Sequence, residues 1–216
     1  PFAKWTCYDV GVHSGFIAKW PGQIKPGSVS DAIIEYSDVV PTFIEVAGGK
    51  PSKNLDGKSL VDLFKGKTET HKEYAYSLQT TRGINNGSEY YGIRSVVSSQ
   101  YRYILNLTPD VPFKNNITEK EVWFDEWTEA AISNETAATL VKNYQYRPNI
   151  EFYDLQNDPF NMDNLADDPR YKVVIDEMHG KLMDWMKACG DKGQQTEMEA
   201  MLHMPKLIKK NKSKDE

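Results

Sequence analysis

The chain has 216 residues, of which 39% are hydrophobic and 26% are charged, proportions typical of an ordinary globular protein with one sizeable core. Its formal net charge is −5, which argues against nucleic acid as the main partner, because phosphate binding needs a basic surface. No apolar run approaches the roughly 18 residues of a membrane-spanning helix, so no membrane span is expected.

The two cysteines, Cys7 and Cys189, are far apart in the sequence. They are too few to form a disulfide framework or a zinc site. We expect Cys7 to pack as a small buried residue instead of reacting, because free cysteines are usually buried.

The first 22 residues place a lone cation, Lys4, among apolar and aromatic neighbours. A polar turn follows at 9–15, and a short apolar run, 16–20, ends at Pro21, which cannot donate to a strand ladder. On spacing alone, we favour the interpretation that Lys4 covers neighbouring aromatic rings over a functional role. The chain opens without a Met or a signal peptide, so we expect it to be part of a larger protein.

Two helices are predicted in the next stretch. The first covers 38–47 and is capped by Ser37 or Asp38. Its apolar face is predicted to consist of Val39, Val40, Phe43, Ile44 and Ala47. A shorter helix is predicted over 60–64, and the polar residues 66–72 mark a boundary.

Beyond that boundary the apolar pattern changes to period two, which indicates half-buried strands. The predicted strands are 74–78, 91–97, 101–107 and 152–155. The second and third form a hairpin across 98–100, and the four together predict a small antiparallel sheet. Arg94 stands beside apolar residues of the second strand, where a buried structural ion pair is expected.

A helical insert, 118–147, separates the third strand from the fourth. Thr118 and Glu121 have the spacing of a capping box, and a second helix is predicted over 135–144 after Asn134. The aromatic residues Trp123, Phe124 and Trp127 could stack on sugar rings, but their helical spacing favours a place in the core.

The last predicted helix starts near Asp168 and crosses the sheet. Its apolar stripe consists of Val174, Met178, Leu182, Trp185 and Cys189. The residues after it, 191–216, are polar and poorly patterned, which predicts a partly ordered tail.

Several of these segments resemble the sulfatase family. Lys4, the turn Tyr8–Gly11 and the sequence Trp20–Gly22 match a family segment in order and spacing, and the ending Tyr153–Pro159 is shared by sulfatases generally. Thr80–Gly83, with the strand motifs that follow it, is similar to the branch of the heparan N-sulfatases and their bacterial relatives. The resemblance covers nearly the whole chain up to its last helix.

The resemblance implies an α+β architecture. Residues 1–66 would be the C-terminal end of an α/β sulfatase catalytic domain, and 191–216 a polar tail. Between them, 67–190 would form a C-terminal subdomain, a four-stranded antiparallel sheet packed with a C-terminal helix.

The resemblance also implies a reaction. Sulfatases use a formylglycine, made in a Cys/Ser-x-Pro/Ala-x-Arg motif, and a calcium ion held by acids. That motif is absent here, so both groups are expected outside this chain, in a missing N-terminal catalytic domain, and this fragment alone is expected to be inactive. The full-length protein would remove sulfate from a sulfated glycosaminoglycan sugar, with N-sulfoglucosamine as the first expectation.

Two other functions stay open at this stage. One is an O-sulfatase acting on another glycan, and the other is a non-catalytic glycan-binding or assembly module. The expected location is periplasmic or extracellular, or lysosomal in a eukaryote, and a homo-oligomer is possible.

Three residues are candidates for the site. By the resemblance, Lys4 contacts the sulfate group. Arg82 lies in a turn where it could pair bidentately with a sulfate or a uronate carboxylate, or form a salt bridge that fixes the loop. His13 stands where the family usually has Arg; it could contact the glycan or donate a proton, although a structural role is favoured.

Overall fold

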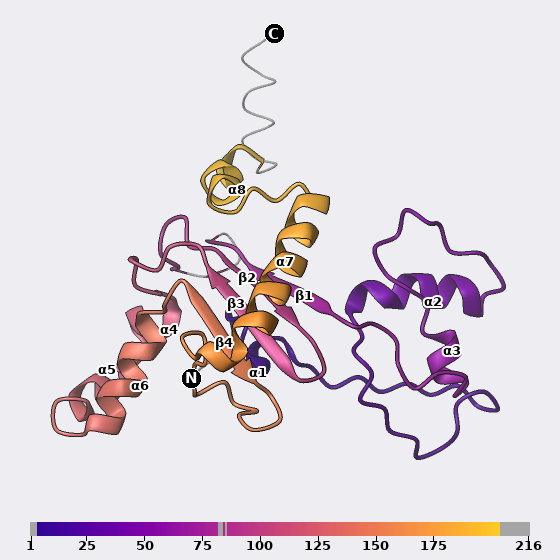
Figure 1. Cartoon of the computed structure of the whole chain (residues 1–216), viewed down its shortest axis with the longest axis horizontal. Coiled ribbons are helices and arrows are strands. Elements are labelled where there is room, and N and C mark those ends of the chain that lie inside the picture. Colours follow the sequence, from indigo (N-terminus) through magenta and orange to yellow (C-terminus); the bar gives the residue numbers. More distant parts are fainter. Residues whose placement is uncertain (1–3, 82–83, 85, 204–216) are drawn as a thin grey trace, which may run out of the picture. The chain divides into compact units, whose positions relative to one another are not determined.

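The computed structural model describes residues 4–81, 84 and 86–203. They form two compact units (Figure 1). The sheet unit contains the described residues of Pro1–His13, Tyr76–Val96 and Arg102–Glu216, and the small unit contains Ser14–Ala75 with Val97–Tyr101. The boundary expected near residue 66 stays a prediction.

A four-stranded antiparallel sheet organises the sheet unit, as the sequence predicted. Its strands are β1 (Ala75–Gln79), β2 (Ile93–Val97), β3 (Tyr101–Asn106) and β4 (Ile150–Asp154), in the order β1-β2-β3-β4. The predicted hairpin between β2 and β3 is confirmed. Each strand pairs with its neighbour in sequence. The β2–β3 connection is a short turn, whereas the β1–β2 and β3–β4 connections are longer.

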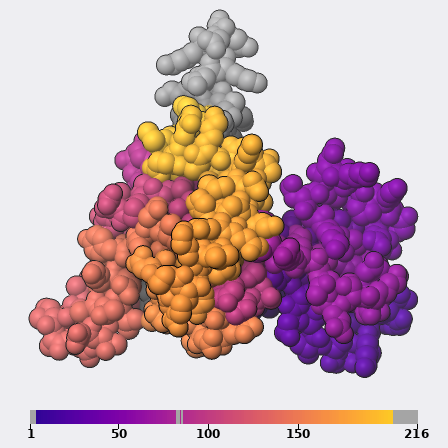
Figure 2. All heavy atoms as spheres, viewed as in Figure 1, coloured from indigo at the N-terminus to yellow at the C-terminus, as the bar shows by residue number. Residues whose placement is uncertain are grey.

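Helix α7 (Lys172–Ala188) lies across one face of the sheet, after the 3-10 helix η3 (Pro169–Tyr171) (Figure 1). In Figure 2 the orange to yellow atoms of this part of the chain form much of the visible surface of the sheet unit. Its buried side chains are Ile175, Met178, Leu182 and Met186. Trp185 stacks on Tyr76 of β1 with ring centroids 5.0 Å apart, and Tyr103 of β3 hydrogen-bonds to His179 at 2.8 Å. The predicted stripe was correct at Met178 and Leu182 but wrong at Cys189, which is exposed just past the last helical residue.

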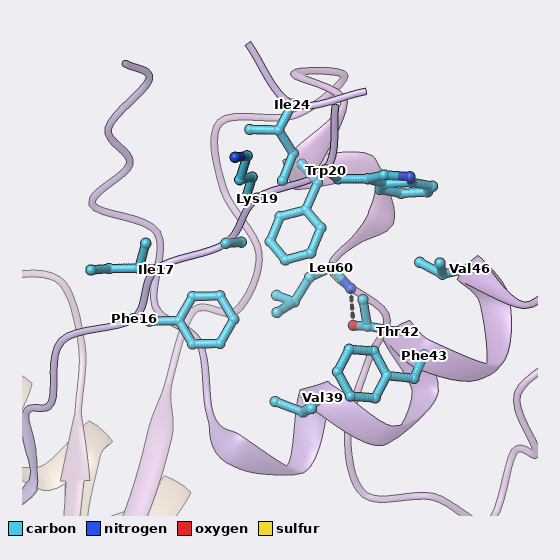
Figure 3. Close-up of a pocket in the computed structure, with 12 residues that line it drawn as sticks. Phe16, Ile17, Lys19, Trp20, Ile24, Val39, Thr42, Phe43, Val46 and Leu60 are labelled. Carbon is cyan, nitrogen blue, oxygen red and sulfur yellow. Dashed lines mark hydrogen bonds between the residues drawn. The ribbon is translucent and has the colours of Figure 1, made fainter. Parts of the chain in front are cut away.

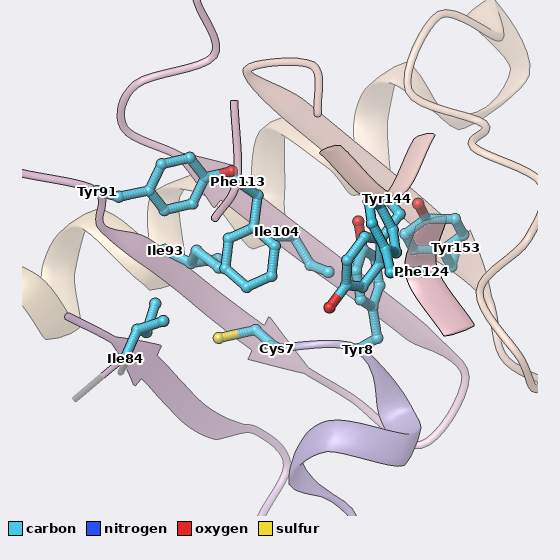
Figure 4. Close-up of a cluster of buried hydrophobic side chains, with 10 residues drawn as sticks. All are labelled: Cys7, Tyr8, Ile84, Tyr91, Ile93, Ile104, Phe113, Phe124, Tyr144 and Tyr153. Carbon is cyan, nitrogen blue, oxygen red and sulfur yellow. The ribbon is translucent and has the colours of Figure 1, made fainter. Parts of the chain in front are cut away.

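The opposite face carries the main core (Figure 4). It is covered by the N-terminal segment with α1 (Asp9–Val12) and by α4 (Asn116–Lys120), α5 (Val122–Ala130) and α6 (Glu135–Gln145). The core cluster consists of Cys7, Tyr8, Ile84, Tyr91, Ile93, Ile104, Phe113, Phe124, Tyr144 and Tyr153. Phe124 belongs to it and Trp123 packs against it, so the core interpretation of these aromatic residues is confirmed for both.

The insert begins earlier than predicted. Asn115, not Thr118, is the N-cap of α4: its Oδ1 accepts hydrogen bonds from the N–H groups of Ile117 and Thr118. The Thr118 hydroxyl in turn accepts from the Asn115 N–H, which completes a capping box. Asn115 is fully buried and donates to the Tyr144 hydroxyl at 2.8 Å, so core packing fixes the helix start. The predicted cap of α6, Asn134, is confirmed.

Arg94 orders part of the expected tail. Its side chain is 1% exposed and is ion-paired with Asp191 and with Glu197, the latter at 2.8 Å, so the predicted buried ion pair is confirmed. Both acids lie past residue 190, and Glu197 belongs to helix α8 (Gln194–Glu199). The ion pairs therefore attach this segment to the sheet, and the 3-10 helix η4 (Ala200–His203) follows it. The sequence did not predict these two helices; the partly ordered tail over 191–216 stays a prediction, and 204–216 lie outside the described residues.

The small unit is built around a buried carboxylate. It contains η1 (Tyr36–Asp38), α2 (Val39–Val46) and α3 (Val61–Phe64). Asp38 is 0% exposed, accepts hydrogen bonds from the N–H groups of Glu35 and Lys58, and is 2.8 Å from the Lys72 ammonium. Burial alone would raise the pKa of Asp38, but these donors hold it below the ordinary value.

The expected apolar face of α2 is contradicted at Val40, Phe43 and Ala47, which are exposed, whereas Val39 and Ile44 are half-buried. Pro41 and Thr42 are its buried residues, because the Thr42 hydroxyl bridges the Asp38 carbonyl and the Leu60 N–H. Phe43 is 69% exposed. The apolar run 16–20 is not a strand, and none of the described strands pairs with it.

No helix among the described residues is both long enough and apolar enough to cross a membrane.

We predict that the two thiols differ sharply in reactivity. Cys7 is 1% exposed and burial raises its pKa to about 11, whereas Cys189 is exposed. Because the thiolate is the reactive form, an aromatic disulfide reagent should modify one thiol quickly in the native protein and the second only after denaturation. Cys189→Ser should abolish the fast reaction. Rapid modification of that variant without denaturant would contradict the burial of Cys7.

We also predict that protonation of His71 destabilises the small unit. The His71 side chain is 2% exposed, and burial lowers its pKa below 6.5, although the Asp38 carboxylate opposes this shift. The folded chain therefore binds fewer protons than the unfolded chain as the pH falls below that value, so the free energy of unfolding should decrease from about pH 7 to about pH 5.

The measurement is urea unfolding of the protein at both pH values. His71→Gln removes the titrating group and should flatten the pH dependence relative to the wild type. The account fails if the variant and the wild type lose equal stability over this interval.

Candidate functional site

The segment that carries Lys4 has an unusual backbone. Lys4 is exposed, and its ammonium lies 4.7 Å from the ring centroid of Trp5. Trp5 has φ +67°, in the left-handed region, which is an outlier for a bulky residue. Such a conformation costs about 1–3 kcal/mol and persists only where the surroundings fix it. Strain of this kind is concentrated at functional sites, so it marks this turn as a candidate.

The residues that follow Lys4 are anchored in the sheet unit. Thr6, Cys7 and Tyr8 are each at most 3% exposed. Arg102 of β3 donates from Nη1 to the Cys7 carbonyl at 2.9 Å and from Nη2 to the Asp9 carboxylate at 2.8 Å. Burial lowers the pKa of the Arg102 guanidinium, and the nearby Asp9 carboxylate opposes that shift.

A second contact holds the same turn from the loop after β4. The side-chain oxygen of Asn161 accepts a hydrogen bond from the Asp9 N–H at 2.8 Å. Asn161 has φ +56°, a conformation that Asn tolerates better than most residues. The backbone of Asp9 and its carboxylate are therefore fixed by two different parts of the chain.

Tyr8 is tied to a buried carboxylate. Its hydroxyl donates to Glu151 at 2.7 Å, and Glu151 also accepts from Tyr153 and from Asn106. Burial raises the pKa of Tyr8 well above its ordinary value, so the phenol stays protonated as a donor. Tyr8, Glu151 and Asn161 also contribute to the lining of a polar pocket of about 310 Å³.

Arg147 packs against the aromatic rings of this cluster. Its guanidinium is 2% exposed and lies 3.9 Å from the ring centroid of Phe113 and 5.2 Å from that of Tyr8. Cation–π contact and the nearby Glu151 carboxylate compensate the buried charge.

The other two predicted site residues are placed differently. His13 is exposed just past α1, and its Nδ1 lies 3.1 Å from the Asp9 carboxylate, so it shares Asp9 with Arg102. Arg82 lies outside the described residues. Its neighbour Thr81 is held through its N–H by Glu197 at 3.2 Å. The roles of His13 and Arg82 stay predictions.

An apolar pocket of about 380 Å³ lies in the small unit (Figure 3). The aromatic residues Phe16, Trp20, Phe43 and Phe64 line it, with the Thr42–Leu60 hydrogen bond at its base. Lys4 lines neither this pocket nor the polar one, so the candidate site is defined by the anchored turn and not by a cavity.

The residues present do not fit a calcium site. Within the described part of the chain, no three His, Cys, Asp or Glu side chains are grouped so that they could hold a metal ion. The sequence also lacks the formylglycine motif.

Sequence reasoning missed the residues that anchor the turn. Arg102 and Glu151 are charged residues in strands with buried neighbours, at 2% and 3% exposure. Charged residues are almost never fully buried unless they are paired. A lone charge at an inward position of a strand could therefore have indicated that Arg102 and Glu151 each have a buried partner.

Comparisons with known proteins agree with the resemblance to the sulfatase family. The family model for the C-terminal region of N-sulphoglucosamine sulphohydrolase matches residues 1–111. An ulvan-active sulfatase of Formosa agariphila is 39% identical over 190 residues, which cover 87% of this chain and 36% of that protein. Human N-sulphoglucosamine sulphohydrolase is 23% identical over 201 residues, covering 77% of this chain and 37% of the human protein.

Solved structures show the same fold. The structure of BT4656 in complex with its substrate D-glucosamine-2-N,6-O-disulfate aligns with a TM-score of 0.55 and 20% identity, over 82% of this chain and 28% of that one. The chain spans about a third of the length of the curated relatives it matches. Because the family model covers more than half of these 216 residues, the chain belongs to the sulfatase family that includes N-sulphoglucosamine sulphohydrolase.

Proposed function

We propose that the full-length protein is a sulfatase that removes sulfate from a sulfated polysaccharide, and that Lys4 of this chain binds the sulfate group. Membership of the family supports the reaction class. The observation that carries the role of Lys4 is its position: an exposed ammonium next to the strained Trp5, followed by buried residues that Arg102 and Asn161 hold.

The chemistry of Lys4 follows from its charge. An ammonium is a compact donor that can reach the oxygens of a tetrahedral sulfate in several orientations. A charge held in place before the reaction stabilises negative charge that grows in the transition state, without reorganisation at that moment. We propose that the formylglycine and the calcium ion come from sequence outside these residues, where a hydrated formylglycine would supply the attacking hydroxyl.

We propose a sulfated polysaccharide as the substrate, on the following support. The 39% identity to an ulvan-active sulfatase, against 23% to N-sulphoglucosamine sulphohydrolase, favours a sulfate ester of a polysaccharide. N-sulfoglucosamine, the first expectation from the sequence, is the second candidate, supported by the family model. His13 and Arg82 are proposed as further substrate contacts, and a periplasmic or extracellular location would give access to such polymers.

Replacement of Lys4 tests its role. In the full-length protein, Lys4→Ala should lower kcat/KM for sulfate release by about a hundredfold or more, the size of effect seen when one preorganised donor is removed. The matched control is Lys65→Ala. Lys65 is also an exposed lysine over a tryptophan ring, 5.5 Å from the centroid of Trp20, but it lies in the small unit. The role is rejected if the two variants have similar, near-normal turnover.

A substrate comparison tests the polymer class. We expect the full-length protein to release sulfate faster from ulvan oligosaccharides than from N-sulfoglucosamine, measured as free sulfate. The reverse order would restore the sulfamidase interpretation. Binding of either sugar without any release, in a protein with intact upstream motifs, would favour a non-catalytic glycan-binding module.

A further inference from the structure

We propose that Arg102 is a positioning residue for Lys4, acting through the backbone of the turn and not through contact with the substrate. This inference rests on the proposed function, because it assigns Arg102 a part in placing the sulfate-binding ammonium. The guanidinium reaches two points on either side of Tyr8: the carbonyl of Cys7 and the carboxylate of Asp9. A planar fork with two donors fixes orientation as well as distance.

Few residues separate the two contacts of Arg102 from Lys4. Only Trp5 and Thr6 lie between Lys4 and the clamped Cys7. Thr6 is 0% exposed and Trp5 is held at φ +67°. With Cys7 and Asp9 fixed, few backbone angles are left to move the Lys4 Cα. The position of the exposed Lys4 ammonium therefore depends on the contacts of Arg102 with Cys7 and Asp9.

Stability alone is a weak reason for this arrangement. Arg102 is 2% exposed, and burial of a charge costs desolvation that an apolar side chain would avoid. Arg94 offers a direct comparison, because it is equally buried on the neighbouring strand and makes two ion pairs, whereas Arg102 makes one ion pair and one hydrogen bond to a carbonyl. Arg94 fastens Asp191 and Glu197 of the C-terminal segment, whereas Arg102 fastens the turn that carries Lys4.

A double-mutant cycle separates positioning from general stability. Arg102→Lys keeps the charge but loses the fork, and in the full-length protein we expect it to lower kcat/KM about tenfold or more. If Arg102 acts through Lys4, the same substitution should have almost no effect on the residual activity of Lys4→Ala, because interacting residues are not additive. The control, Arg170→Lys at an exposed ion pair with Asp168, should change activity by the same factor in both backgrounds.

A second readout uses inorganic sulfate as a competitive inhibitor. Arg102→Lys should raise the inhibition constant for sulfate, and Arg170→Lys, at an exposed ion pair with Asp168, should leave it unchanged. This measurement needs no activity from Lys4→Ala. If Arg102→Lys does not fold, Asp9→Asn takes its place, because it removes the charged acceptor of Arg102 Nη2 and leaves the Cys7 contact in place.

The outcomes are distinct. Equal effects of Arg102→Lys with and without Lys4, or an unchanged sulfate inhibition constant, would overturn the positioning role while the proposed function stands. Absence of sulfate release by the wild type, or full activity of Lys4→Ala, would reject the proposed function and this inference with it.

Discussion

The two-point contact of Arg102 with the N-terminal turn is the interaction on which the rest of the candidate site depends. It joins β3 to the Cys7 carbonyl and the Asp9 carboxylate, and so converts a surface segment into part of the sheet unit. Tyr8 between these two points then enters the core and reaches Glu151. Lys4 stands three residues before the clamped Cys7, so the clamp limits where its ammonium can lie.

The sheet is the frame that makes this contact possible. Helix α7 covers one face, and the N-terminal turn with the helical insert covers the other, so both faces of β2 and β3 are buried. Side chains alternate along each strand, and the two buried arginines serve different faces: Arg94 meets the segment after α7, and Arg102 meets the turn. Each arginine therefore connects the sheet to a segment distant in sequence.

Local patterns predicted most of the elements and few of the long-range contacts. Period-two alternation identified the strands, and the Asn134 cap located α6, because these signals act over a few residues. The start of α4 was missed because Asn115 is fixed by Tyr144, 29 residues away. The order of residues 191–203 was missed because Arg94 pairs with acids about 100 residues later. The role of Lys4 was accessible only through family resemblance, since spacing alone favoured packing on an aromatic ring.

The most direct test of the account is a structure of the full-length protein with sulfate bound. The account predicts that the Lys4 ammonium lies within about 3 Å of a sulfate oxygen, with the Arg102 contacts to Cys7 and Asp9 retained. A sulfate bound elsewhere, with the Lys4 ammonium directed into bulk water, would contradict it.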